Sequence, residues 1–404
     1  MDGITMATPA WQTRLWVSTT ALLLLLTGCG GAGTTQSQTN IIARAVTTPQ
    51  PAPAVVGTAV LFEGSPTAAR YVRTEGVMTT TQPFRVASIA KVLTATVVLQ
   101  LVEEGYFTLD TPLSRLLDDT LLPAGYTLDD LHVMGNRKAG GSITVRQLLQ
   151  HTAGLRDYIA DSPTAQDSNG LFAQMITDVL DNDGRGIASR HWDGKALLGY
   201  YLTTGLGRNA LSAPGQRFDY SDTDYLLLGL VVEQVTGQSL TSHYRGRIFN
   251  RLGMANTWHE GFEANRGTVA QHFYTVATAG NPRNLEMTAT RLDMSAAWAS
   301  GALVSTPDEL AVFLRALMRG ELFRDRATLA LMKQTSKVSP NYGLGLQRAV
   351  LNGREVWGHA GFWGTIMLHD AGKDALLVMT LNDTSRDMYQ EAEKVLRAAA
   401  SAVR

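Results

Sequence analysis

Apolar segments of strand-like length lie near both ends of the chain. Two of them, 55–63 and 69–75, precede the first helical pattern. From about residue 341 onward, four more predicted strands alternate with Gly and Asn/Asp turns: NYGLGLQRAVL, REVWGHAG, GTIMLHDAG and DALLVMTLND. A final helix is predicted over 385–403.

Between these strands the pattern is helical, and the helix ends carry matching cap residues. The predicted helices are 88–105 closed by Gly105, 143–151 with Thr144 as N-cap, 225–235 closed by Gly237, and 307–317 with Thr306 as cap and Pro307 in first position. The polar stretch 156–200 predicts loops around one or two short helices. We therefore predict an α+β fold, in which one antiparallel sheet comes from both chain ends, is flanked by helices and contains a mostly helical insertion.

Composition limits the function without naming it. The 404 residues, 45% hydrophobic and 18% charged, suit one large globular domain or two intergrown lobes. The formal net charge of −1 gives no reason to expect nucleic acid as a partner. The single cysteine, Cys29, excludes a disulfide within the chain.

Residues 1–28 have the pattern of a secretory signal, with Met6 as an alternative start to Met1. Arg14 is followed by about a dozen apolar residues and then by the sequence LTGC, which ends at Cys29. This ending resembles the bacterial lipobox, in which the cysteine is acylated and becomes the new N-terminus. A plain signal peptide with a chance cysteine is the alternative.

Three parts of the chain follow from this pattern. Residues 1–28 are expected to be a lipoprotein signal peptide, and 29–54, rich in Gly, Thr, Gln and Pro, a flexible tether. Residues 55–404 are expected to form the folded domain. Acyl chains on Cys29 would anchor the protein to a membrane on the periplasmic side of the cell envelope. Gly30 carries no inner-membrane retention signal, so the outer membrane is preferred.

A single charged residue, Lys91, stands in the otherwise apolar helical segment 86–102. Ser88 lies three residues earlier, on the same helix face and in the first turn, where unpaired N–H groups favour a developing negative charge. Desolvation favours the neutral amine of Lys91, which can then take the proton of Ser88. The alternative is a chance spacing with a lysine that reaches to water, but the flanking residues leave it no polar face.

Four segments match the motifs of one family in order and spacing over about residues 56–400. They are FRVASIAK (84–91), LLQHTAGL (148–155), FDYSD with YLLLG (218–222 and 225–229) and WGHAG (357–361). Each is weak alone, but together they resemble the serine β-lactamase-related family, which includes class C β-lactamases, D-Ala-D-Ala carboxypeptidases, family VIII carboxylesterases and D-aminopeptidases. The resemblance implies a β-lactamase/transpeptidase-like fold.

The resemblance also implies roles for particular residues. Ser88 would be the acylated nucleophile, Lys91 its activating partner, and Tyr220 the general base in acylation and the acid toward the leaving group. A neighbouring Lys⁺ is expected to ease Tyr220 toward its anion. The backbone amides of Ser88 and Phe362, the residue after Gly361, would form the oxyanion hole. A half-buried packing aromatic is the alternative for Tyr220.

Two departures from the family pattern affect the expected substrate. Asp222 stands where Asn is common, and its carboxylate would hold Lys91 charged and repel an anionic substrate group. His359-Ala360-Gly361 stands where β-lactamases often have Lys-Thr-Gly, and a neutral His beside an Ala binds a carboxylate poorly. Both changes weaken the case for β-lactam hydrolysis and favour an esterase or a peptidase. The alternative for His359 is a strand histidine satisfied by its neighbours.

Other features are left open or rejected. Phe362 and Trp363 either wall an apolar acyl pocket or pack the sheet, His151 is expected to be structural, and Ser300 is assigned no chemistry. The Asp-rich stretch at 181 lacks the Glu of a calcium loop, and no zinc spacing, phosphate loop or G-x-S-x-G elbow occurs.

The sequence thus predicts a serine hydrolase that needs no metal or cofactor and works through an acyl-enzyme on Ser88. Its substrate would be a small molecule or peptide with an ester or amide carbonyl: a D-Ala-D-Ala peptide, a small ester or a β-lactam. The alternative is a non-catalytic sensor of the same fold that binds penicillin or peptidoglycan. The oligomeric state stays open.

Overall fold

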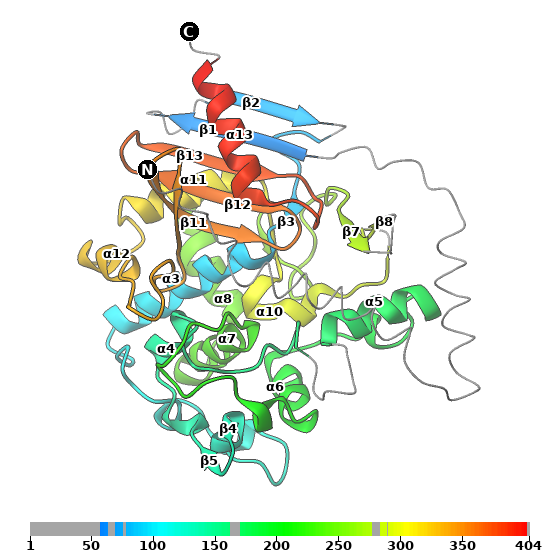
Figure 1. The fold of residues 1–404 in the computed structure, drawn as a ribbon, viewed down its shortest axis with the longest axis vertical. Coiled ribbons are helices and arrows are strands. Elements are labelled where there is room, and N and C mark those ends of the chain that lie inside the picture. The colour runs from blue at the N-terminus through cyan, green and yellow to red at the C-terminus, as the bar shows by residue number, and fades with distance from the viewer. Residues whose placement is uncertain are drawn as a thin grey trace, which may run out of the picture.

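Strands from both ends of the chain pair in one antiparallel sheet. A computed structural model describes residues 57–63, 69–75, 78–161, 170–276, 283–288 and 290–401. The six strands are β1 (Gly57–Glu63), β2 (Ala69–Glu75), β10 (Gln347–Leu351), β11 (Arg354–Gly361), β12 (Thr365–Asp370) and β13 (Ala375–Thr380). Their order in the sheet is β10-β11-β12-β13-β1-β2 (Figure 1). Strand β1, from the N-terminal part of the chain, therefore pairs directly with β13, from the C-terminal part. The predicted α+β fold is confirmed, whereas the signal peptide, the tether and Cys29 lie outside the described residues.

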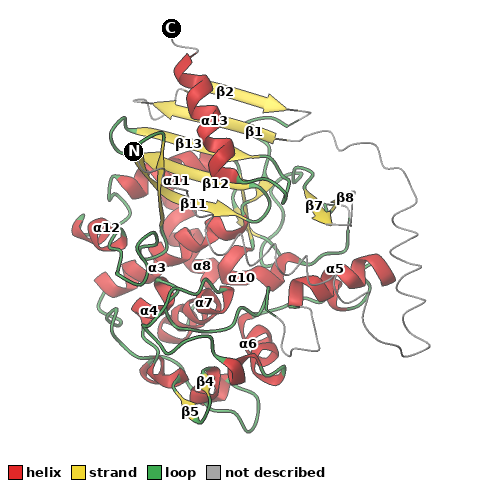
Figure 2. Cartoon of the chain, viewed as in Figure 1, coloured by secondary structure: helices red, strands yellow, loops and turns green. Residues whose placement is uncertain are grey.

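The sheet separates two apolar layers. Alternate residues of β12 and β13 face opposite sides, because successive strand side chains point in opposite directions. Ile366 and Leu377 pack against α13 (Met388–Ser401), while Met367 and Val378 join the large core on the other side. That core includes α11 (Pro307–Met318), which contacts β12 and β13, so helices cover both faces of the sheet (Figure 2).

The region between β2 and β10 is mostly helical, as predicted. Its helices are α3 (Ala90–Glu103), α4 (Val145–Leu149), α5 (Leu171–Asn182), α6 (Gly194–Thr203), α7 (Asp222–Thr236), α8 (Leu240–Tyr244), α9 (Asn250–Leu252), α10 (Trp298–Gly301), α11 and α12 (Ala327–Met332). Short strands complete it: β3 (Phe84–Arg85), β9 (Leu303–Ser305) and β6 (Trp258–His259) in one sheet, and the hairpins β4 (Val133–Met134) with β5 (Arg137–Lys138) and β7 (Phe273–Val276) with β8 (Arg283–Glu286).

The cap residues predicted several helix ends correctly, but four helix or strand starts differ from the prediction. Thr144 and Thr306 accept N-cap hydrogen bonds, and Gly237 ends α7 in the left-handed conformation, as expected. The helix predicted from 88 begins as a 3₁₀ turn, and α7 starts at 222 because Ser221 caps it there. The strand predicted from 341 starts only at 347, since the residues before it form turns, and α13 starts at 388 instead of 385.

Helix α3 lies in the middle of the molecule and is surrounded by protein. Its residues from 90 to 101 are all buried, in agreement with the apolar pattern. It packs against α7 and α10, which approach each other closely because a Cβ at Gly229 would lie 2.7 Å from that of Ala299. The Thr94 hydroxyl of α3 forms hydrogen bonds with the Tyr244 hydroxyl of α8 and with the Ala299 carbonyl of α10, each at 2.6 Å.

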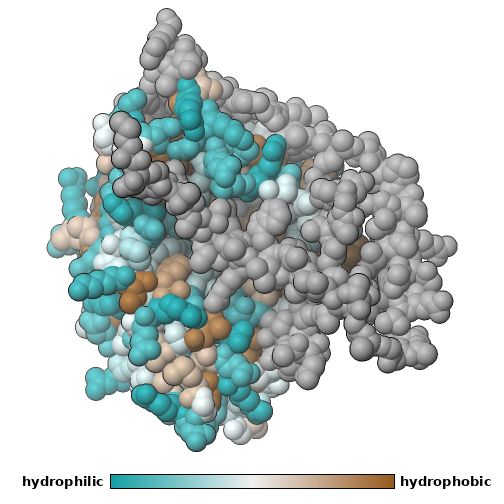
Figure 3. All heavy atoms as spheres, viewed as in Figure 1, coloured by the Kyte–Doolittle hydropathy of each residue, from teal (hydrophilic) through white to brown (hydrophobic). Residues whose placement is uncertain are grey.

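On the face drawn in Figure 3, the hydrophobic residues of the described part of the chain form small patches among hydrophilic ones. The large hydrophobic side chains exposed in the described residues are Tyr106, Met134, Val312, Val338 and Val350. They belong to separate segments and are ordinary for a globular surface. None of the described helices combines the length and the apolar character that a membrane span requires.

One buried hydrogen bond ties the sheet to the segment before α3. The Thr365 hydroxyl donates to the Val86 carbonyl at 3.0 Å. Thr365→Val keeps the shape but removes this donor, so the free energy of unfolding should fall by about 1 kcal/mol. Chemical denaturation measures the change, and Thr365→Ser, which keeps the hydroxyl, serves as the matched control. Equal stability of the Val variant and the wild type would contradict this role.

Candidate active site

Ser88 lies in a strained 3₁₀ turn between β3 and α3. The preceding residue, Ala87, has φ = 50°, a left-handed conformation that is uncommon for a residue with a side chain. The turn is held by its neighbours, since the Val86 amide donates to the Leu303 carbonyl at 3.0 Å. Ser88 is partly exposed, whereas the residues on both sides of it are buried. The turn therefore presents one hydroxyl at the edge of the core, and such strain is frequent at functional sites.

Lys91 is fully buried and donates three hydrogen bonds. Its Nζ lies 3.0 Å from the Ser88 Oγ and 3.0 Å from the Ser300 carbonyl, and it also pairs with the Asp222 carboxylate. An ammonium has three N–H donors, so each has one acceptor. The Asp222 carboxylate thus lies directly beside Lys91, as the sequence analysis expected, while the role of Lys91 as a base stays a prediction.

Tyr220 completes the group around Ser88. Its ring lies 4.9 Å from the Lys91 Nζ, and it shares a hydrogen bond with Ser88. Burial and the Asp222 carboxylate raise the pKa of Tyr220 well above its usual value, and the bond with Ser88 lowers it only in part. The expectation that Lys91 would ease this tyrosine toward its anion is wrong, because burial and the Asp222 carboxylate favour the neutral phenol.

A buried histidine and aspartate lie behind Tyr220. The His151 ring packs 4.2 Å from the Tyr220 ring, and its Nδ1 is 2.8 Å from an Asp224 oxygen. The Ser221 amide also donates to Nδ1 at 3.2 Å, so the proton of the pair belongs to Asp224. Burial lowers the pKa of His151 and raises that of Asp224, which favours the same neutral pair. Sequence analysis assigned His151 a structural role but missed Asp224, for which the sequence carries no separate signal.

His359 is neutral and has no free ring nitrogen. Its Nδ1 donates to the Ala360 carbonyl at 2.6 Å, and its Nε2 accepts from the Tyr342 hydroxyl at 3.0 Å. Burial, with a contribution from Lys91, lowers the pKa of His359 to about 3. These bonds favour the alternative reading of a satisfied strand histidine, and they leave the ring without a donor for a substrate carboxylate.

Gly361 lets the end of β11 lie directly against the Ser88 turn. A Cβ at this position would be 2.4 Å from the Val86 carbonyl oxygen and 2.3 Å from the Thr365 hydroxyl, so no other residue fits without movement. Phe362 follows at once and is thereby brought beside the same turn. The assignment of the Phe362 amide to the oxyanion hole stays a prediction, and the close contact between Gly361 and the Ser88 turn supports it.

Phe362 is one of four aromatic rings, from three chain segments, that pack together. Phe172 of α5 lies 5.1 Å from Phe362 and 5.5 Å from Tyr274 of β7, and Trp363 lies 5.0 Å from Phe362. Trp363 is buried, whereas the other three are partly exposed. Trp363 therefore packs the interior, while Phe172, Tyr274 and Phe362 form an apolar surface that a substrate group can contact.

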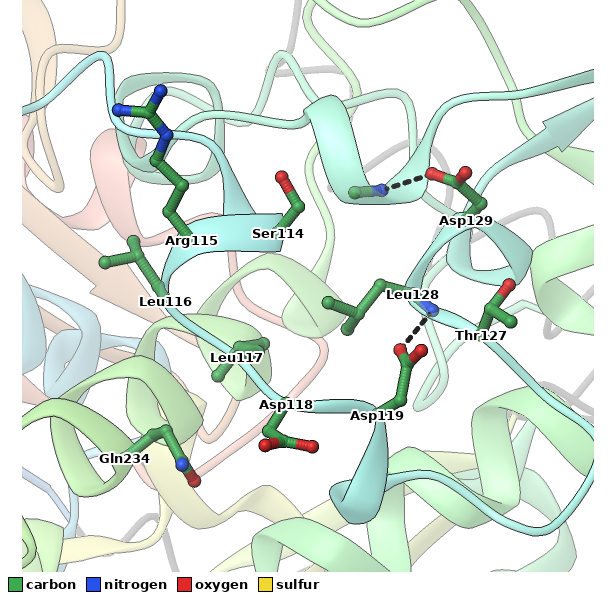
Figure 4. A pocket seen from close by; sticks show the side chains of 11 residues that line it. Ser114, Arg115, Leu116, Leu117, Asp118, Asp119, Thr127, Leu128, Asp129 and Gln234 are labelled. Atoms are coloured by element: carbon green, nitrogen blue, oxygen red, sulfur yellow. Dashed lines mark hydrogen bonds between the residues drawn. The ribbon is translucent and has the colours of Figure 1, made fainter.

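A surface hollow of about 560 Å³ lies elsewhere, lined by 114–119, 127–129, Gly141 and Gln234 (Figure 4). Asp119 and Asp129 there accept the backbone N–H groups of Leu128 and Gly141. Gln234 is near the end of α7, about 18 Å along the helix from Asp222. None of the residues around Ser88 lines this hollow.

Comparisons with known proteins identify the family. The Beta-lactamase family model matches residues 47–402, which is most of the chain, and this chain belongs to that family. Its relatives in these comparisons include proteins named as a carboxypeptidase, penicillin-binding proteins, an esterase and an acyltransferase. The described residues contain no group of three or more His, Cys, Asp or Glu side chains arranged to hold a metal ion.

Individual relatives differ in their named activities. The chain is 26% identical over 262 residues to a putative D-alanyl-D-alanine carboxypeptidase of Escherichia coli O157:H7, covering 55% of this chain and 60% of the relative. It is 31% identical over 196 residues to esterase EstB of Burkholderia gladioli, covering 47% and 41%. The chain thus spans about half the length of these relatives. A D-stereospecific amidohydrolase from a Streptomyces species aligns with a TM-score of 0.67 and 27% identity, over 90% of this chain and 97% of the other.

Gly361 provides a test of the close approach between β11 and the nucleophile turn. Gly361→Ala should lower kcat for a p-nitrophenyl ester about 100-fold, because the added Cβ displaces the strand end from Ser88. Gly246→Ala, where a Cβ meets no atom within 4 Å, is the control and should keep both activity and melting temperature. A folded Gly361→Ala variant with full activity would contradict the assignment.

Proposed function

We propose that this protein hydrolyses an ester or amide through an acyl-enzyme on Ser88. The observation that supports this best is the Ser88 hydroxyl, which is partly exposed, 3.0 Å from the Lys91 ammonium and hydrogen-bonded to Tyr220. A nucleophile, a fixed positive charge and a second proton-carrying group within bonding distance are the parts that acyl transfer requires.

In the proposed acylation, the Tyr220 phenolate takes the proton of Ser88 as its Oγ attacks the carbonyl carbon. The Lys91 ammonium donates to Oγ and stabilises the alkoxide character that develops there. The backbone amides of Ser88 and Phe362 are proposed to stabilise the oxyanion. The intermediate collapses when Tyr220 gives its proton to the leaving oxygen or nitrogen.

Deacylation reverses these proton transfers. A water molecule attacks the acyl carbon and passes a proton to Tyr220, the carbonyl–Oγ bond breaks, and Ser88 regains a proton from Tyr220. His151 and Asp224 are positioning residues in this scheme, since His151 packs against Tyr220 and Asp224 bonds to His151. Their neutral state adds no charge beside the tyrosine.

The charges around Ser88 favour a substrate without a carboxylate beside the scissile bond. The Lys91 side chain already donates to three acceptors in the protein. His359 is neutral, and both of its ring nitrogens form hydrogen bonds within the protein. Arg85, three residues before Ser88, is paired with Glu260. We therefore favour esters and uncharged amides over D-Ala-D-Ala peptides and β-lactams, whose carboxylates would meet no available cation among these residues.

The nucleophile can be tested directly. Ser88→Ala should reduce hydrolysis of a p-nitrophenyl ester to the uncatalysed background, because no other group can form the acyl-enzyme. The melting temperature should stay close to the wild-type value, since the serine is only partly buried. Ser189→Ala, an exposed serine away from the site, is the control. Residual full activity would remove Ser88 from the mechanism.

The pH dependence tests the role of Tyr220. Activity should rise with pH through the alkaline range, because the pKa of Tyr220 is raised and its phenolate is the base. Asp222→Asn removes a negative charge that raises this pKa, so the rising limb should move to lower pH. The profile of kcat/KM is measured with an ester that does not titrate, and exposed Asp181→Asn is the control. An unmoved limb would contradict Tyr220 as the base.

A further inference from the structure

Asp222 presents one carboxylate oxygen that the protein itself does not use. Oδ1 pairs with Lys91, whereas Oδ2 has no hydrogen-bond partner among the described residues. The side chain of Asp222 is 15% exposed and that of Lys91 is 0% exposed. A molecule that enters the site therefore meets the carboxylate side of the ion pair and not the ammonium.

The carboxylate of Asp222 stands at the start of α7. Asp222 is the first residue of the helix after the N-cap Ser221, where the unpaired N–H groups favour an anion. Its own amide donates to Asp157 at 3.1 Å, which fixes the backbone of the residue. The Lys91 partner holds Oδ1 from the other side. The free oxygen Oδ2 is thus an acceptor next to Ser88.

The distances limit which part of a substrate can reach Asp222. One atom, the Lys91 Nζ, bridges Ser88 Oγ and Asp222 Oδ1, so these oxygens lie at most two hydrogen-bond lengths apart, about 6 Å. An α-amino nitrogen is two bonds, about 2.5 Å, from the carbonyl carbon that Ser88 attacks. An amino group at that position on the acyl part of the substrate can therefore be placed within hydrogen-bonding distance of the carboxylate while Ser88 attacks the carbonyl carbon.

We propose that Asp222 binds the α-ammonium group of an aminoacyl ester or aminoacyl amide with a free amino terminus. This inference rests on the proposed hydrolase function and adds the substrate class to it. The partly exposed rings of Phe172, Tyr274 and Phe362 lie beside the same site and suit an apolar side chain on the acyl part. Asp222 alone does not choose between the D and L forms.

Two matched esters test the proposal: phenylalanine methyl ester, in both D and L forms, and methyl 3-phenylpropionate, which differs only by lacking the amino group. At pH 6.5 the wild type should show a kcat/KM at least about tenfold higher for one phenylalanine ester, because a charge-assisted hydrogen bond forms. This preference should weaken as pH rises through the pKa of the free α-amino group, near 7.7 to 8.0 in peptides.

Asp222→Asn keeps an acceptor for Lys91 but removes the charge, so the ratio of the two kcat/KM values should fall toward one. Asp181→Asn should leave the ratio unchanged. A melting curve shows whether the Asn variant is folded, and the pH dependence of the wild-type ratio provides a second test that needs no variant.

Three results overturn the proposal. The wild type can show no preference for either phenylalanine ester, it can keep its preference at high pH, or folded Asp222→Asn can keep the wild-type ratio. If Ser88-dependent cleavage of methyl 3-phenylpropionate persists in these cases, the proposed hydrolase function stands and only ammonium binding fails. Absence of Ser88-dependent cleavage of every ester overturns both.

Discussion

The buried ammonium of Lys91 is the interaction on which the site depends. A charge without water must find acceptors within the protein, and Lys91 has three, from Ser88, Asp222 and the Ser300 carbonyl. These acceptors come from the start of α3, the start of α7 and α10, so satisfying one side chain brings three distant segments to one point. The same contacts fix the nucleophile, orient the carboxylate and place a positive charge beside Oγ. Lys91 thus both holds these three segments together and takes part in the proposed chemistry.

The sheet supplies the other half of the site. Pairing of β1 with β13 joins the two chain ends, and β11 runs from this sheet to the Ser88 turn, where Gly361 permits contact with Val86. The helical insertion supplies Tyr220 and Asp222, and behind them a neutral histidine–aspartate pair. The residues around Ser88 therefore lie between the sheet and the helices.

Much of this arrangement could be predicted from the sequence. The alternating pattern after residue 341 predicted the strands, cap residues predicted several helix ends, and a lone lysine in an apolar helix predicted its burial. Three features could not be predicted. The positive φ of Ala87 depends on the packing of the whole turn, and the partnership of His151 with Asp224 joins residues 73 apart. The raised pKa of Tyr220 depends on its burial and on the nearby Asp222 carboxylate.

The most direct test of the account is the mass of the protein during turnover. A slowly hydrolysed p-nitrophenyl ester is mixed with the enzyme, the reaction is quenched in acid, and the intact mass and the modified peptide are measured. The account predicts a transient increase equal to the acyl group, located on Ser88, which decays as product forms. Turnover without a covalent adduct, or an adduct on another residue, would contradict the acyl-enzyme mechanism.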